Sequence, residues 1–105
     1  MKTLTTLSAA LLSAVIASPV MAAVTAEESC GYQADVVAAI QQARLDRVKE
    51  RKVSETLAAS EPTWPENFNA TIPLIAPWIY EQKMKVIRNE DLGAVWKERC
   101  LDQIQ

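Results

Sequence analysis

The two cysteines, Cys30 and Cys100, are the residues of this chain with the most clearly defined chemistry. They stand about 70 positions apart, whereas redox-active cysteines normally share the short Cys-x-x-Cys spacing. Two cysteines alone in an exported chain pair by default, so we expect a structural disulfide between them. In the chain-entropy model, closing a loop of this length stabilises a fold by roughly 4 kcal/mol.

The sequence contains no histidine, the most common general base near neutral pH and a frequent metal ligand. With both cysteines in a disulfide, a zinc site has too few ligands. Only two glycines occur, and neither a phosphate-binding loop nor a dinucleotide-binding motif is present. We therefore expect no catalytic residues, no metal site, no cofactor and no enzymatic activity. The adjacent acids Glu90 and Asp91 are better explained as helix-capping residues.

Two aromatic residues, Trp64 and Phe68, lie in a segment with two prolines and could be displayed for recognition of a partner. The alternative is that both side chains fold back and cover one end of a small core. We favour the second interpretation, because a short chain needs the apolar area of its aromatic side chains.

A second pair of candidate binding residues, Gln41 and Arg44, projects close to the apolar stripe of the first predicted helix. These side chains could line a groove, but an arginine more often lays its aliphatic stem over the core and keeps its charge in water. If the guanidinium is buried, Glu98 or Asp91 is its expected partner.

The N-terminus has the pattern of a signal peptide: Lys2 precedes an apolar run over residues 7–16, and Pro19 and the small residue Ala22 follow. We expect cleavage after Ala22, which leaves residues 23–105 as a single helical domain in the periplasm or outside the cell. The apolar run is shorter than the roughly 20 residues that span a bilayer, so we expect no stable membrane insertion.

Without the leader the chain keeps all 13 acidic side chains and loses one of its 11 basic ones, which gives a net charge of −3. This excess of acids argues against a nucleic-acid partner and against electrostatic binding to anionic lipids. A short basic run is interrupted by Asp46 and Glu50, so we expect it to form a solvated face of mixed charge. The run comprises Arg47, Lys49, Arg51 and Lys52. The remaining candidate partner is another protein.

Hydrophobic periodicity predicts an all-α fold, a small bundle of three main helices and one short helix, closed by the disulfide. The first helix is expected to run from an N-cap at Ser29 to about Arg51. Its predicted buried stripe comprises Cys30, Ala34, Val37, Ala38, Leu45 and Val48, with Ile40 at the margin. The short helix is expected to begin at Ser54 and to end before Ser60.

Residues 62–70 are predicted to form a loop, because they contain two prolines, two asparagines and no periodicity. The third helix should start near Thr71, with Pro73 in its first turn, unless Pro77 prevents it. Either this helix carries a kink at Pro77, or the helix proper begins near Pro77. We prefer the start near Pro77, because an internal proline removes a backbone donor. It is expected to end near Arg88, where Asn89 caps the fourth helix. Gly93 in the fourth helix indicates a close helix crossing.

Three functions are consistent with these features, and the first is a binding module of the bacterial envelope that acts as an inhibitor or adaptor of another protein. The second is an acid- or stress-responsive periplasmic chaperone, since a helical chain of this size with one disulfide resembles the periplasmic acid-stress chaperones in size and layout. The resemblance implies a response to acid, which carboxylates must supply in a chain without histidine. The third and least favoured function is a hydrolase that uses carboxylates alone.

Overall fold

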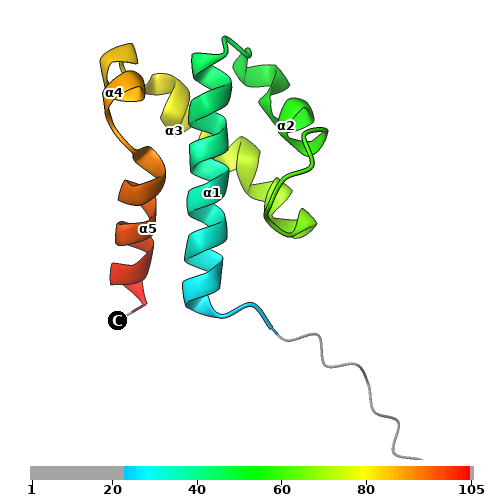
Figure 1. The fold of residues 1–105 in the computed structure, drawn as a ribbon, viewed down its shortest axis with the longest axis vertical. Helices are drawn as coiled ribbons and strands as arrows, with labels where there is room; N and C mark the ends of the chain where they lie inside the picture. Colours follow the sequence, from blue (N-terminus) through cyan, green and yellow to red (C-terminus); the bar gives the residue numbers. More distant parts are fainter. Residues whose placement is uncertain (1–22, 105) are drawn as a thin grey trace, which may run out of the picture.

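A computed structural model describes residues 23–104, and the predicted leader lies outside this range (Figure 1). The described part folds into five α-helices and one 3-10 helix, which are α1 (Ala26–Leu45), α2 (Glu50–Ala58), η1 (Glu66–Thr71), α3 (Ile72–Glu81), α4 (Met84–Asn89) and α5 (Leu92–Gln103). This range contains no strand, so the predicted all-α class is confirmed. The third predicted helix is divided into α3 and α4, and α4 has only 6 residues.

The helix α1 is the centre of the fold, because every other helix packs against it. In Figure 1, α5 lies along one side of α1 and α2 lies on the other. The buried side chains of α1 therefore point in more than one direction, and the single predicted stripe was too narrow. Val36 and Ala43 are buried outside that stripe, whereas Ala38 and Leu45, inside it, are exposed.

The helix α1 begins and ends earlier than predicted. Thr25, not Ser29, is the N-cap, and its hydroxyl oxygen accepts a hydrogen bond from the backbone N–H of Glu28 at 3.1 Å. The helix ends at Leu45, well before the predicted end, because Arg47 adopts a left-handed conformation with a φ of 62°. A residue in this conformation reverses the direction of the chain.

Two backbone hydrogen bonds identify this C-terminus of α1 as a Schellman motif. The N–H of Val48 donates to the carbonyl of Ala43 at 2.9 Å, and the N–H of Arg47 donates to the carbonyl of Arg44 at 3.0 Å. The motif turns the Val48 side chain back onto the core, and the chain then enters α2 at Glu50, earlier than the predicted start at Ser54.

The helix α3 begins at Ile72, and Pro77 lies inside it, so the preferred start near Pro77 was wrong. The proline removes one hydrogen bond, whose acceptor would be the carbonyl of Pro73. Pro73 and Pro77 are both exposed, so water can satisfy the free carbonyl. The opposite face of α3 buries Ile72, Ile75, Ala76 and Ile79, and this burial holds the helix across the proline.

The helical conformation is interrupted between α3 and α4 at Gln82, whose backbone is extended with a φ of −68° and a ψ of 148°. The next cap also differs from the prediction. Asp91, not Asn89, caps α5, and its Oδ1 accepts a hydrogen bond from the N–H of Ala94 at 3.0 Å. Asn89 instead ends α4, and its side-chain amide donates to the carbonyl of Lys85. The expected capping role of Asp91 is therefore confirmed.

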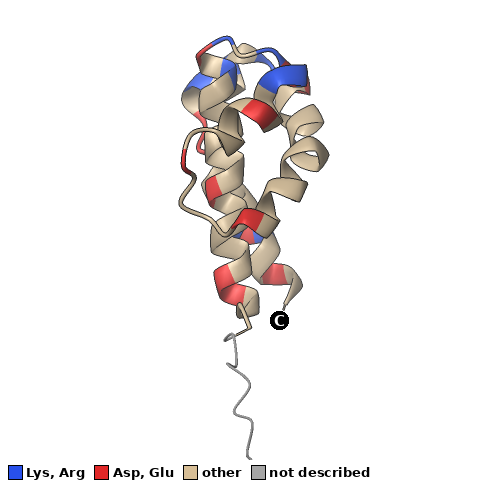
Figure 2. Cartoon of the chain, turned by 90° about the vertical axis from the view of Figure 1, so that its right-hand side faces the viewer, with Lys and Arg blue, Asp and Glu red and all other residues tan. Residues whose placement is uncertain are grey.

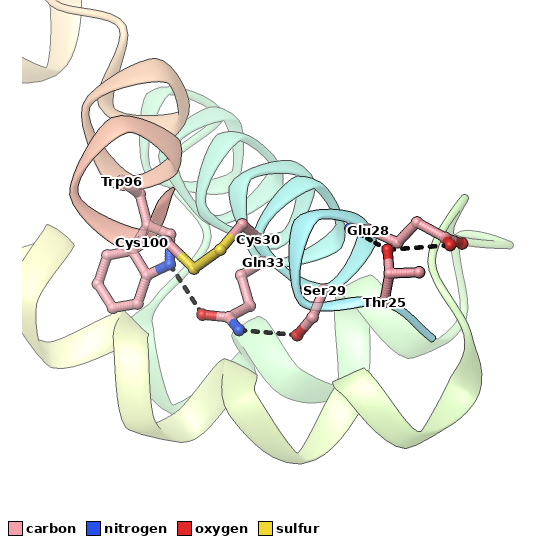
Figure 3. The surroundings of a disulfide bond; sticks show 7 residues. All are labelled: Thr25, Glu28, Ser29, Cys30, Gln33, Trp96 and Cys100. Atoms are coloured by element: carbon pink, nitrogen blue, oxygen red, sulfur yellow. Dashed lines mark hydrogen bonds between the residues drawn. A yellow bond between two sulfur atoms is a disulfide. The ribbon is translucent and has the colours of Figure 1, made fainter. Parts of the chain in front are cut away.

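The disulfide between Cys30 and Cys100 is present, as predicted, and joins the first turns of α1 to the last turns of α5 (Figure 3). The two Cα atoms are 5.6 Å apart, within the usual range for a disulfide. Cys30 is 1% exposed, whereas Cys100 is only partly buried. Because α1 and α5 run in opposite directions, the bond closes the bundle at the end where the chain terminates.

Within residues 23–104, none of the helices has both the length and the apolar character that crossing a membrane requires.

Candidate functional site

Gln41, a predicted binding residue, uses its whole amide group inside the fold. Its Nε2 donates to the carbonyls of Ile87 and Glu90 at 2.8 and 2.7 Å. Its Oε1 accepts a hydrogen bond from the backbone N–H of Leu92 at 3.3 Å. One side chain of α1 thus fixes the segment between α4 and α5, where backbone groups lack helical partners. This residue positions two helices, and both hydrogens of its side-chain amide are used within the fold.

Arg44 also has its partners within the fold, and they are not the acids that were expected. Its guanidinium donates to the backbone carbonyl of Ile79 in the last turn of α3, where a positive charge also interacts favourably with the helix dipole. The guanidinium carbon lies 5.5 Å from the centroid of the Tyr80 ring. The expected partner Asp91 caps α5, and Glu98 is exposed.

The hydroxyl of Tyr80 donates to the carbonyl of Val48, so it joins the end of α3 to the connection between α1 and α2. Burial raises the pKa of Tyr80 above its ordinary value of 10.0. The nearby Arg44 guanidinium acts in the opposite direction, because it favours the phenolate, and Glu50 adds to the increase. Arg44 and Tyr80 therefore form a polar cluster that ties together α1, α3 and the connection between α1 and α2.

Trp64 and Phe68 are buried, which agrees with the favoured interpretation that they cover one end of the core. The indole N–H of Trp64 donates to Oδ1 of Asn69 at 2.8 Å. The Phe68 ring lies against the Tyr32 ring of α1 with a centroid distance of 5.3 Å. The structure therefore separates the four candidate residues into two places, and it displays neither of these two aromatic side chains.

The most exposed large apolar side chain of the described residues is one that sequence reasoning missed, Leu74, which is 78% exposed. It lies on α3 between two exposed prolines, Pro73 and Pro77. We name these three residues the α3 outer face. A signal was available in the sequence, because residues 72–79 contain no polar side chain and so leave α3 without a hydrophilic side.

A groove between α2 and α3 borders the α3 outer face. Its volume is about 380 Å³, and it is lined by Glu50, Arg51, Ser54, Pro73, Ala76 and Pro77. The surface therefore combines apolar side chains from α3 with a polar, charged edge from α2. Such a combination resembles the apolar centre and polar rim of protein–protein interfaces.

Charge is distributed unevenly along the molecule. Figure 2 shows Lys and Arg gathered mainly at the end away from the C-terminus, with several acids near the C-terminal end. The basic run, which extends from the connection after α1 into the first turn of α2, is exposed. Within it, Lys52 forms an exposed ion pair with Glu55, with 3.6 Å between the charged atoms, an interaction that contributes little to stability. Arg47, Lys49 and Arg51 also face solvent.

Within residues 23–104, no group of three or more His, Cys, Asp or Glu side chains is arranged to hold a metal ion. Comparisons with family models, with curated proteins and with solved structures give no match to this chain.

Proposed function

We propose that this chain is an exported protein-binding module of the bacterial envelope, which docks onto another protein through the α3 outer face. The observation that carries the proposal is that Leu74 is 78% exposed on α3. This helix is apolar on its outward face as well as on the face that it buries in the core. The outward side of a surface helix is normally polar. An exposed apolar patch with a polar edge is typical of an interaction site.

The two prolines beside Leu74 support docking at this site for an entropic reason. Binding normally costs free energy because side chains lose rotational freedom. Pro73 and Pro77 have almost no such freedom to lose, so most of the apolar area on this face is already ordered. The opposite face of α3 is buried in the core, which makes the helix a rigid platform.

The charge beside the groove indicates what kind of partner suits this surface. Arg51 lines the groove, and the exposed cations Arg47, Lys49 and Lys52 lie close to it along the chain. We therefore propose a partner protein with an apolar pocket for Leu74 and acidic side chains at its rim. Complementary charge would speed the encounter and orient the two proteins, and an inhibitor or adaptor benefits from both.

The proposed location rests on two features. A disulfide that closes the fold is consistent with an oxidising compartment, and the leader pattern over residues 1–22 is that of an exported chain. We propose that the leader is removed and that the protein acts in the periplasm or outside the cell as a binding protein without catalytic activity.

Affinity capture from a native envelope fraction, with matched variants, tests this proposal. The unchanged protein, Leu74→Lys and Ile104→Lys are immobilised at equal amounts, and the captured proteins are quantified by mass spectrometry. Ile104 is a suitable control because it is also an exposed apolar residue, 47% exposed, but lies beyond the end of α5. We expect a partner that the unchanged protein and Ile104→Lys capture equally and that Leu74→Lys loses.

The proposal is wrong if the three proteins capture the same set, or if both substitutions cause the same loss. A second check is the salt dependence of capture, because contacts between Arg51 and an acidic rim weaken as salt screens them. Self-association through Leu74, detected by sedimentation of the purified protein, would replace a foreign partner by a second copy and would also overturn the proposal.

An acid-responsive chaperone is a second candidate, and the capping of the two disulfide-linked helices favours it. Glu28 accepts a hydrogen bond from the Thr25 hydroxyl at the start of α1, and Asp91 caps α5. Both helix starts thus depend on carboxylates, which interact favourably with the positive end of a helix dipole. Client aggregation in strong acid, with and without the protein, tests this idea, and equal aggregation would exclude it.

A further inference from the structure

A pocket of about 280 Å³ lies beside the disulfide, where α1, α3 and α5 meet, away from the α3 outer face. It is lined by Gln33, Trp78, Trp96, Arg99, Cys100 and Gln103. This volume is just below the roughly 300 Å³ at which typical small-molecule sites begin, so it suits a molecule smaller than a usual ligand. The pocket is therefore large enough for a small organic molecule and too small for a folded partner.

Two tryptophans supply the apolar walls. Trp78 and Trp96 are both only partly buried, and their ring centroids are 5.6 Å apart with an angle of 50° between the ring planes. Large aromatic side chains contribute most to stability when fully buried, so two half-covered tryptophans at one pocket leave apolar area for a ligand to cover.

Hydrogen bonds hold one of these walls in place. The indole N–H of Trp96 donates to Oε1 of Gln33 at 3.0 Å, and Nε2 of Gln33 donates to the hydroxyl of Ser29 at 3.1 Å (Figure 3). The disulfide joins the same two helices next to this chain of bonds. The Trp96 ring is therefore fixed before any ligand arrives, which lowers the cost of binding.

Arg99 supplies a positive charge at the same pocket. Among residues 23–104, no carboxylate lies within ion-pair distance of this guanidinium. A guanidinium can hold a carboxylate through two parallel hydrogen bonds, so it selects an anionic group at this position. The side-chain amide of Gln103 adds a further polar group to the lining.

We propose that this pocket binds a small organic carboxylate with one apolar ring, the ring against Trp78 and Trp96 and the carboxylate on Arg99. Two features of the site define this ligand class. The tryptophan walls require an apolar body of about one ring, because the volume admits little more. The Arg99 guanidinium, which has no carboxylate partner within residues 23–104, selects a ligand that carries one negative charge at the end away from its ring.

The test uses hydrocinnamate as the probe and its uncharged analogue, hydrocinnamyl alcohol. Each is titrated into the disulfide-bonded protein while tryptophan fluorescence is recorded, since two of the three tryptophans line the pocket. We expect a saturable change with hydrocinnamate. The alcohol and the Arg99→Gln variant should both bind about tenfold more weakly, because each removes one charge-assisted interaction.

Lys97→Gln is the matched control, because it removes one positive charge from the same helix and Lys97 does not line this pocket. It should leave the affinity for hydrocinnamate unchanged. A change with hydrocinnamate that never saturates, or an equal loss of affinity in Lys97→Gln and Arg99→Gln, would refute a specific carboxylate site. An equal loss in the two variants would mean that Arg99 attracts the anion only through its charge and makes no specific contact with it.

A second measurement records the rate at which the disulfide is reduced, because Cys100 lines the pocket and is more exposed than Cys30. A bound ligand should cover the Cys100 sulfur and slow its reduction by dithiothreitol. We expect saturating hydrocinnamate to slow reduction severalfold in the unchanged protein and not in Arg99→Gln. An equal rate with and without hydrocinnamate would place any binding elsewhere and overturn the proposal.

Discussion

The backbone of Gly93 in α5 lies so close to α1 that a Cβ atom at this position would be 2.9 Å from the carbonyl oxygen of Ala34. Real Cβ atoms essentially never approach a backbone oxygen this closely, so the contact is possible only for glycine. The close crossing that Gly93 indicated in the sequence is thus confirmed. It sets the distance between the two helices that the disulfide joins.

Substitution of Gly93 by alanine should destabilise the fold by about 1–3 kcal/mol, because α5 must move away from α1. Gly31→Ala is the matched control, since a Cβ there meets nothing within 4 Å. Gly31 also lies in α1, where alanine is favoured over glycine by about 0.5–1 kcal/mol. Urea unfolding should therefore show opposite changes for the two substitutions. A destabilised Gly31→Ala, or a neutral Gly93→Ala, would contradict the packing described here.

Replacement of Gln41 by alanine should lower the free energy of unfolding by about 1–2 kcal/mol. The carbonyls of Ile87 and Glu90 at the end of α4 and the N–H of Leu92 at the start of α5 lose their side-chain partner. The neighbouring Gln42→Ala is the control, because Gln42 bonds only to the exposed Asp46. It should change stability by less than about 0.5 kcal/mol, and equal losses in the two variants would remove the positioning role of Gln41.

Arg47→Gly should stabilise the protein by about 0.5–1 kcal/mol. Arg47 holds the left-handed position of the Schellman motif with a φ of 62°, a conformation that is strained for residues other than glycine. The gain is partly offset because glycine has more freedom in the unfolded chain. Thermal unfolding of Arg47→Gly and of Arg51→Gly, an exposed position inside α2, compares the two effects. Arg51→Gly should be destabilising, and a loss of stability in Arg47→Gly would be inconsistent with relief of strain.

The same residue explains why the first helix was predicted to be too long. The helix ends at Leu45 because Arg47 adopts the left-handed conformation. Glycine usually occupies this position after a helix, and a glycine in the sequence would have indicated the end. With arginine there, the apolar periodicity continues through Val48 and gives no sign of a stop. The start of α3 was missed for a related reason, since tertiary burial of residues such as Ile75 outweighs the local cost of Pro77.

The sequence predicted best those features that depend on covalent chemistry or on single steric requirements. The pairing of Cys30 with Cys100 followed from their number, and the close approach at Gly93 from the absence of a side chain. The roles of Gln41 and Arg44 could not be predicted, because their acceptors are backbone carbonyls in helices distant along the chain. The pocket between Trp78 and Trp96 likewise exists only once α3 and α5 meet.

Removal of the disulfide should lower stability by about 2–5 kcal/mol without changing the fold class. A double variant, Cys30→Ala with Cys100→Ala, leaves a loop of 70 positions unconstrained in the unfolded state. Circular dichroism should still show a helical protein, because the core around α1 draws on every helix. A thiol assay on the unmodified, purified protein should find no free sulfhydryl. Free thiols in that assay would contradict the bond, and unchanged stability in the double variant would show that the bond contributes nothing.

The stability of the fold at alkaline pH should depend on the partly buried hydroxyl of Tyr80. Burial raises the pKa of Tyr80 in the folded state above the ordinary value of 10.0, so the fold binds this proton more tightly than the unfolded chain does. The stabilisation is therefore complete below pH 10.0 and is lost as the pH rises through the higher folded pKa. Ionisation also removes the donor that the carbonyl of Val48 accepts.

Comparison of the Tyr80→Phe variant with the unchanged protein isolates the contribution of the Tyr80 hydroxyl, because the two proteins have the same lysines. At neutral pH the variant should be less stable by about 1 kcal/mol, because the hydrogen bond to Val48 is gone. Above pH 10.0 the difference between the two proteins should shrink, since the unchanged protein then loses the same bond. Tyr32→Phe, which alters the other tyrosine, should show no such convergence. A constant difference between Tyr80→Phe and the unchanged protein across this range would mean that the Tyr80 proton does not contribute to the stability of the fold.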